Sequence, residues 1–340
     1  MAAKKTRRAS TRHGKIHLHI ENTGRLDPVF QVTAKRLEDA LKNYPQVARR
    51  LTVSLGQDGD IFDRVIGKTD VLFGWNFDRR DLKNRAPRLK WAAAHAAGVG
   101  HLMPLDWLPK GAVLTNSSGV HGDRATEYLL MALLMLNNRL PEMATSQRLR
   151  RWKQEFNSGI AGKTLLIIGV GSIGGGAAKW AKRLGLTVLG IRRTGRRQRY
   201  VDRMYRPRDL RRLLPRADFI MMTTPYTKDT HHMLGAREIA LIKRGAGLIN
   251  YSRAKLVDYE ALRKRLVKRE ISAVLDVFSP EPLPSSSPLW HAPNLVITPH
   301  CSSDDTEAYT PRTLDLLMRN MARFMAGKKL MNRVSAKYGY

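Results

Sequence analysis

Apolar positions recur along the chain in two alternating rhythms. Short apolar runs with the two-residue period of a strand alternate with stretches whose apolar residues are three and four positions apart, as in an amphipathic helix. In the first third of the chain, residues 29–43 predict a helix that ends before Pro45, and strands are predicted at residues 15–20, 51–54, 71–73, 89–94 and 112–115. Strands that alternate with helices indicate βαβ units and a parallel sheet.

A second series of the same kind follows two long predicted helices, at residues 123–138 and 141–154. Pro141 stands at the first position of the second helix, which favours Pro. The next helix is predicted from Gly174, and strands are predicted at residues 164–168, 187–191, 219–222, 247–249, 271–275 and 295–297. A final helix at residues 306–325 lies outside this series. We expect it to return and pack on the first domain.

The sequence therefore predicts an α/β protein of two Rossmann-like domains with parallel sheets. We expect a discontinuous first domain, residues 1–118 and 305–340, and a second domain, residues 119–304, because residues 116–119 form a hinge-like turn cluster. A length of 340 residues fits two domains of roughly 100 to 200 residues. No apolar run reaches ~18 residues, so no membrane span is expected. The single cysteine, Cys301, favours a reducing compartment, and we expect a cytoplasmic protein.

The net charge of +31 is high and is concentrated in two segments. Residues 1–15 carry six Lys or Arg and no acid, and residues 192–216 carry eleven Arg against two Asp. Such segments can hold nucleic acid or an acidic membrane. A charge run is more often a solvated surface, and no nucleic-acid motif accompanies these two. We therefore favour a solvated surface that attracts anionic substrates, and a flexible basic tail over residues 1–14.

A glycine motif follows the predicted strand at residues 164–168. Gly169, Gly171 and Gly174 permit respectively a tight turn, a close approach of backbone to a pyrophosphate, and close packing of helix and strand. The motif also includes Ser172 and Ile173 at the start of the predicted helix, whose free N–H groups favour an anion. Because the motif lies between a predicted strand and a helix, it predicts a dinucleotide-binding second domain.

The end of the next predicted strand indicates which dinucleotide is bound. NAD-binding proteins usually place Asp or Glu there, on the ribose hydroxyls. This chain has Arg192, Arg193 and Thr194 instead. Guanidinium groups suit a 2′-phosphate, which an acid would repel. The position predicts NADP or NADPH as cofactor and disfavours NAD, unless the two arginines only begin the basic surface.

Three residues of the second domain suit reduction of a keto acid: the cation Arg253, the carboxylate Glu281 and the imidazole His300. With them the chain resembles the D-isomer-specific 2-hydroxyacid dehydrogenases, especially glyoxylate/hydroxypyruvate reductase-like members. The resemblance extends from about Leu72 onward. It rests on the glycine motif, on Pro225, and on residues 97–99, 116–120, 127–128, 249–253, 275–278, 281–284, 288–290 and 298–300.

The resemblance implies a role for each matching residue. Arg253 would bind the substrate carboxylate, His300 would be the general acid, and Glu281 would orient the imidazole and favour its protonated form. The first domain would contribute a carboxylate cradle, and Trp75 either lines this pocket or packs. The remaining implied residues are Ala97, Gly98 and Val99 of the cradle, Asp276 at the nicotinamide carboxamide, and Pro225, Thr230 and Tyr251 of the cofactor site.

The family also implies a homodimer, consistent with a helix at residues 123–138 that is apolar on more than one face. Ala254 and Gly100 depart from the usual pattern, in which Gly and Asp are frequent. These departures bear on the identity of the small anionic 2-keto acid more than on the reaction. A dinucleotide-sensing corepressor, which shares this fold, is the alternative function; nucleic acid is the less favoured partner, and neither a metal nor a membrane is expected.

Overall fold

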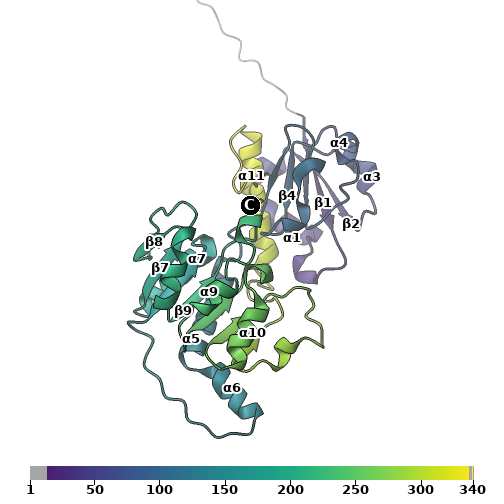
Figure 1. Ribbon diagram of the computed structural model, residues 1–340. Helices are drawn as coiled ribbons and strands as arrows, with labels where there is room; N and C mark the ends of the chain where they lie inside the picture. Colours follow the sequence, from purple (N-terminus) through teal and green to yellow (C-terminus); the bar gives the residue numbers. More distant parts are fainter. Residues whose placement is uncertain (1–13, 337–338, 340) are drawn as a thin grey trace, which may run out of the picture. The chain divides into compact units, whose positions relative to one another are not determined.

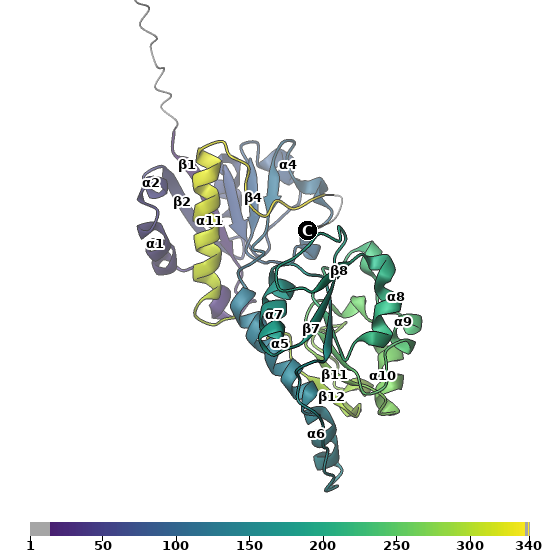
Figure 2. The same cartoon turned by 90° about the vertical axis from the view of Figure 1, so that its left-hand side faces the viewer.

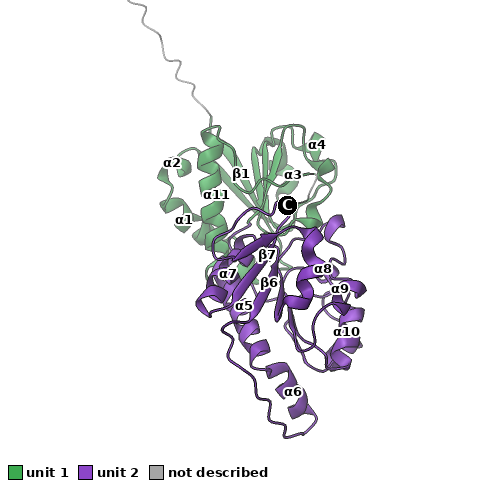
Figure 3. Ribbon diagram, turned by 60° about the vertical axis from the view of Figure 1, so that its left-hand side comes forward, with its two compact units in different colours: residues 1–117, 307–340 green, residues 118–306 purple. Residues whose placement is uncertain are grey.

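The computed structural model describes residues 14–336 and residue 339. It divides into two compact units, residues 1–117 with 307–340 and residues 118–306 (Figure 3). The predicted division at residues 118/119 and 304/305 lies within two residues of these limits. The predicted basic tail falls almost entirely outside the described residues.

Unit 1 is built on a five-stranded parallel sheet in the order β2-β1-β3-β4-β5 (Figure 1). The strands are β1 (Ile16–Asn22), β2 (Leu51–Gln57), β3 (Val71–Gly74), β4 (Trp91–Ala94) and β5 (Val113–Thr115). The helices are α1 (Ala34–Lys42), α2 (Pro45–Ala48), α3 (Phe62–Val65), α4 (Leu82–Arg85) and α11 (Tyr309–Met325). The parallel pairing agrees with the βαβ pattern of the sequence.

The last helix, α11, packs on unit 1 as predicted. Leu314, Leu317, Met318 and Met321 share a buried cluster with residues of β1, β3, β4 and α1. Figure 2 shows α11 lying along the sheet of unit 1 beside α1 and α2. A second cluster on the opposite face of the sheet takes in α3 and α4. The helix therefore completes the core of a domain whose other elements come from the first third of the chain.

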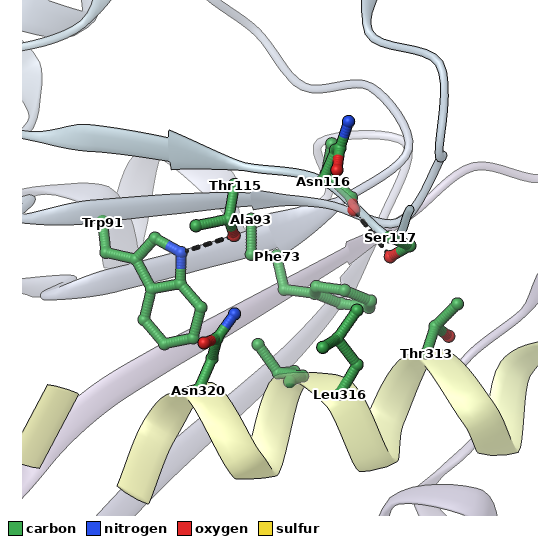
Figure 4. A pocket seen from close by; sticks show the side chains of 11 residues that line it. Phe73, Trp91, Ala93, Thr115, Asn116, Ser117, Thr313, Leu316 and Asn320 are labelled. Atoms are coloured by element: carbon green, nitrogen blue, oxygen red, sulfur yellow. Dashed lines mark hydrogen bonds between the residues drawn. The ribbon is translucent and has the colours of Figure 1, made fainter. Parts of the chain in front are cut away.

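A small cavity lies between α11 and strands β3 to β5 (Figure 4). Trp91 donates from Nε1 to Thr115 Oγ1 at 2.8 Å on one side, and Ser117 Oγ donates to the carbonyl of Ala94 at 3.0 Å on the other. Its volume is about 10 Å³, near the lower limit for one water molecule. It is too small for the keto acid that the resemblance implies.

Unit 2 contains a seven-stranded parallel sheet in the order β12-β11-β10-β9-β6-β7-β8. The strands are β6 (Thr164–Ile168), β7 (Thr187–Ile191), β8 (Arg203–Tyr205), β9 (Phe219–Met222), β10 (Gly247–Asn250), β11 (Ser272–Leu275) and β12 (Leu295–Ile297). The helices are α5 (Gly122–Asn137), α6 (Leu140–Arg148), α7 (Ser172–Arg183), α8 (Leu210–Leu213), α9 (Ala236–Ala240) and α10 (Tyr259–Val267). One buried cluster joins the sheet to α8, α9 and α10, and another joins it to α5 and α7. Strand order reverses beside β6, where ligands bind in open α/β sheets.

Several predicted boundaries shift. The helix predicted from residue 29 begins at Ala34, because Pro28–Phe30 form a short 3-10 turn capped by Asp27, and Thr33 caps the helix through its hydroxyl. The helix predicted to reach residue 154 ends at Arg148, and Arg150 adopts a left-handed φ of 54°. Strand β8 was not predicted. None of the helices in the described part of the chain has the length and apolar character needed to cross a membrane.

Candidate functional site

The glycine motif forms the turn between β6 and α7. Gly169 has a φ of 104°, and a side chain there would collide with the backbone of Thr224. A Cβ on Gly174 would lie 2.6 Å from the carbonyl oxygen of Gly169. By contrast, no described atom lies within 4 Å of a Cβ built on Gly171, the residue that precedes Ser172 at the start of α7. Two glycines therefore serve packing and one leaves open access to the helix N-terminus, which fits a pyrophosphate.

Arg192 lies next to this turn. β6 and β7 pair with Ile168 opposite Ile191, and the N–H groups of Gly169 and Val170 both donate to the carbonyl of Ile191. Arg192 follows directly and begins a turn that closes with a bond from the Gly195 N–H to its carbonyl, 3.0 Å. Arg192, Arg193 and Thr194 are all exposed. Contact of these side chains with the adenosine end of a dinucleotide stays a prediction.

Two other predicted cofactor residues have mainly internal contacts. Thr230 accepts from the Thr227 N–H at 2.7 Å and donates to the carbonyl of Pro225 at 2.9 Å, so it ties together the loop after β9. Tyr251 follows β10 and packs edge-on against Tyr128, with ring centroids 5.4 Å apart. Burial raises the pKa of Tyr251 far above its usual range, so its hydroxyl remains protonated. Contact of either residue with cofactor stays a prediction.

His300 and Glu281 form a close pair. The Nδ1 atom of His300 lies 2.7 Å from Glu281 Oε2, and the other carboxylate oxygen accepts from the backbone N–H of Phe278 at 2.6 Å. Both side chains are partly exposed. Because Glu281 is fixed by backbone and occupies Nδ1, the Nε2 atom of His300 is the nitrogen available to a substrate. This geometry fits an oriented acid–base histidine.

Arg253 stands at the start of the 3-10 turn Ala254–Leu256, three residues after β10 ends. One terminal nitrogen donates to the carbonyl of Ser252 at 2.7 Å. Burial lowers the pKa of the Arg253 guanidinium, and the negative charge of Glu281 offsets this shift only in part. An arginine pKa is so high that the group remains a cation at neutral pH. Unit 2 therefore brings a cation into electrostatic reach of the His300–Glu281 pair.

Asp276 lies at the end of β11 and is fully buried. Its Oδ1 accepts from Thr298 Oγ1 at 2.6 Å and from the Cys301 N–H at 3.2 Å. Its Oδ2 accepts from the N–H and the hydroxyl of Ser302, at 3.3 and 2.5 Å. One carboxylate thus holds the chain on both sides of His300, which itself adopts a left-handed φ of 51°.

His121 is a residue of this region that the sequence did not reveal. It precedes α5, and its Nδ1 lies 3.0 Å from the carbonyl of Ser303, so Nδ1 carries the proton and donates. Burial lowers the pKa of His121, and Arg253 and His300 lower it further. Burial also raises the pKa of Asp304, which lies 3.8 Å from the same Nδ1. No residue pattern marks this histidine, since its partners are 182 and 183 positions away.

The predicted substrate residues of the first domain lie in unit 1. The carbonyl of Ala97 accepts from Asn116 Nδ2 at 2.8 Å, and Val99 is buried; Gly98 lies between them. The Trp75 ring is 5.1 Å from the ring of Phe30 and 6.4 Å from that of Tyr309. Trp75 thus packs in an aromatic cluster of unit 1. A pocket-lining role for Trp75 and a carboxylate cradle at residues 97–99 stay predictions.

The fold and the glycine turn define a class, the two-domain α/β dehydrogenases, and comparison with known proteins narrows it. The family model for the NAD-binding domain of D-isomer specific 2-hydroxyacid dehydrogenases matches residues 130–302, about half of the chain. A glyoxylate reductase of Thermococcus litoralis is 33% identical over 266 residues, which cover 75% of this chain and 80% of that protein. The chain belongs to the D-isomer specific 2-hydroxyacid dehydrogenase family.

Other relatives agree with this assignment. The glyoxylate/hydroxypyruvate reductase B of Pectobacterium carotovorum is 33% identical over 66% of this chain and 72% of its own length. Among solved structures, a D-isomer specific 2-hydroxyacid dehydrogenase of Xanthobacter autotrophicus in complex with NADPH and MES superposes with a TM-score of 0.81. It is 27% identical, and the alignment covers 96% of this chain and all of that one. The fold class predicted from the sequence is thereby confirmed.

Proposed function

We propose that this chain reduces a small 2-keto acid, of the glyoxylate or hydroxypyruvate type, to the D-2-hydroxy acid with NADPH. The observation that carries the proposal is the His300–Glu281 pair at 2.7 Å, in one unit with Arg253 and an open glycine turn. Relatives described as glyoxylate reductases, and a 25% identical NADPH-dependent glyoxylate/hydroxypyruvate reductase of Sinorhizobium meliloti in complex with NADP and sulfate, support it.

The side chains of unit 2 would divide the work as follows. Bound NADPH would supply the hydride. Arg253 would hold the substrate carboxylate with the paired donors of its guanidinium. His300 would protonate the keto oxygen from Nε2 as the carbon becomes reduced, and would remain as a neutral imidazole with its proton on Nδ1. Glu281 would stabilise the charged imidazole before the transfer and hold its orientation afterward.

The direct test is NADPH oxidation followed at 2-keto acids of increasing size, with glyoxylate, hydroxypyruvate and pyruvate first. Turnover of at least one of them, with the D-hydroxy acid as product, is expected. A protein that binds NADPH but reduces none of a broad set would instead support the dinucleotide-sensing alternative. Binding of NADPH, measured separately, distinguishes that result from a misfolded preparation.

For Asp276 we propose a role that differs from the one implied by the family resemblance. The family resemblance assigns it to the nicotinamide carboxamide, yet four donors of residues 298–302 already point at its carboxylate. We propose that it positions His300. Asp276→Asn would turn an amide NH₂ toward donors and leave a buried group unsatisfied, at a cost of about 1–3 kcal/mol. We expect kcat to fall roughly tenfold or more, since each ~1.4 kcal/mol is tenfold.

A split between kcat and cofactor binding checks this prediction. If Asp276 acts through the loop, NADPH affinity should change little, and Ser302→Ala, which removes one of the four bonds, should lower kcat less than Asp276→Asn. If the main loss in both variants is NADPH affinity, the carboxamide role is the correct one.

We also propose that the protein is a homodimer. Large apolar side chains are exposed on α5 (Met131 and Leu134), at the end of α6 (Leu149) and in the segment after it. In that segment Trp152 is 95% and Phe156 83% exposed. Figure 2 shows α6 extending beyond the sheet of unit 2. Such a patch marks an interaction site, and a second copy would cover it by symmetry.

The dimer prediction is checked by light scattering at micromolar concentration. We expect twice the chain mass for the parent protein and a shift toward the monomer for Trp152→Ser with Phe156→Ser. Trp290→Ser is the matched control, because Trp290 is an exposed aromatic residue of the 3-10 turn Pro288–His291, outside α5, α6 and the segment after them, and should leave the mass unchanged. A strictly monomeric parent would refute the proposal.

A further inference from the structure

The arginine-rich segment forms one edge of unit 2. Strand β8 is the last strand of the sheet (Figure 1). In the sequence it is preceded and followed by arginines. We call this surface the arginine edge and define it by eight exposed residues: Arg192, Arg193, Arg196, Arg197, Arg199, Arg203, Arg206 and Arg208. The structure thus places on one border what the sequence showed only as a charge run.

Contacts within unit 2 hold this segment against the sheet. The side chain of Gln198 packs against Gly175 of α7, where it lies 3.2 Å from the place that a Cβ on Gly175 would occupy. Within the segment, the side chain of Arg206 packs against Gly195 at the same distance. Asp202 accepts from Lys182 of α7 at 2.9 Å and from the Val188 N–H at 2.7 Å. The arginines are therefore carried by an ordered loop and strand.

The acids of the segment do not neutralise the edge. Asp202 pairs with Lys182, Asp209 pairs with Arg212 at 3.1 Å, and Arg211 pairs with Glu238 at 2.7 Å. Among the described residues, no carboxylate oxygen lies within 4.0 Å of a guanidinium nitrogen of these six arginines: Arg196, Arg197, Arg199, Arg203, Arg206 and Arg208. A solvated surface usually intersperses charges of both signs. Charged side chains protect an edge strand from unwanted pairing, but most of these arginines lie outside the three residues of β8.

The chemistry of the edge favours phosphodiesters over other polyanions. Residues 192–216 contain no lysine, and arginine is the side chain that binds phosphate through two parallel donors. Arg199 stacks over the exposed ring of Tyr200, with the guanidinium carbon 4.8 Å from the ring centroid. Arginines interleaved with an exposed aromatic ring suit a nucleic-acid backbone and an unpaired base. Basic clusters also bind anionic phospholipid head groups, so the experiment includes phospholipid vesicles as a separate probe.

We propose that the arginine edge binds the phosphodiester backbone of nucleic acid without sequence preference. This binding is an activity additional to the reductase reaction, with which it shares only Arg192 and Arg193 of the cofactor site. Affinity in the micromolar range is expected for such contacts. The affinity should fall steeply with salt, with a log–log slope of about −0.7 for each phosphate contact to a single strand.

The test compares two triple variants of the full chain with equal change in net charge. Arg196→Gln, Arg197→Gln and Arg199→Gln alter the edge but spare Arg192 and Arg193. The matched control is Arg237→Gln, Arg244→Gln and Arg263→Gln, which removes the exposed Arg237 and Arg244 and the half-buried Arg263 from the α9–α10 side of the same unit. Fluorescence anisotropy is measured with a labelled single-stranded RNA and a labelled duplex DNA, from 50 to 200 mM salt.

We expect the edge variant to bind at least one probe tenfold or more weakly and with a shallower salt slope. The control should stay within twofold of the parent, and reductase activity, which reports the fold, should persist in all three proteins. A preference for the single strand would assign the stacking role to Tyr200. Equal weakening in both variants, or binding to anionic phospholipid vesicles without binding to either oligonucleotide, would overturn the proposal.

Discussion

Replacing His300 with glutamine should lower kcat for keto-acid reduction by ~10²-fold or more, the scale of general acid catalysis. Glutamine retains a polar tip of similar reach but has no proton that it can release near neutral pH. The bond from the Phe278 N–H to Glu281 and the bonds to Asp276 do not involve the His300 side chain, so the loop itself should persist. NADPH affinity, measured by fluorescence titration, should remain close to that of the parent.

Glu281→Gln is the informative companion variant. Two groups converge on this carboxylate, the Phe278 N–H and Nδ1 of the His300 imidazole. A glutamine offers one acceptor oxygen to both, so one donor must face an NH₂ group. We expect a smaller loss of kcat than in His300→Gln, because the proton donor itself remains. Normal turnover in His300→Gln would show that the proton comes from another group and that this site is misassigned.

The regular parts of the fold could be predicted because their apolar patterns are strong. The strands that become β6, β7, β9 and β12 were predicted at their observed limits, since each is a short and mostly apolar run. Strand β8 could not be predicted in this way. It is three residues long, lies at the edge of the sheet and begins with the exposed Arg203, so neither face shows an alternation.

The candidate site likewise has residues that the sequence reveals and contacts that it does not reveal. Arg253, Glu281, His300 and the glycines stand in motifs whose residue types are unusual enough to recognise without a structure. The hydrogen bonds that hold the His300 loop in place cannot be recognised in this way. The four bonds to Asp276, and the bond from His121 to Ser303, depend on which strand ends lie side by side. A sequence pattern does not reveal such contacts, because an acid or a histidine with quite different partners would give the same pattern.

The adenosine end of the cofactor site gives the second large effect. We expect kcat/KM with NADPH to exceed that with NADH by roughly a hundredfold or more. A 2′-phosphate carries about −1.5 to −2 charges near pH 7, and a hydrogen bond to a charged group contributes about 1.5–3 kcal/mol. Two such bonds, from Arg192 and Arg193, correspond to at least two factors of ten, since each ~1.4 kcal/mol is tenfold. Salt should reduce the ratio, because both side chains are exposed.

Arg192→Asp should reverse much of this preference. The substitution removes one attraction and places a carboxylate where it repels the 2′-phosphate and can accept from ribose hydroxyls. Arg196→Asp is the matched control: it makes the same charge change four residues on, beyond the turn that Gly195 closes, and should leave the ratio within about twofold if the effect is a local contact and not a screened field. The measurement is kcat/KM for both cofactors in all three proteins at one ionic strength. Equal efficiencies in the parent would mean that Arg192 and Arg193 belong to the arginine edge alone, and that the cofactor contacts the glycine turn without using the charge beside it.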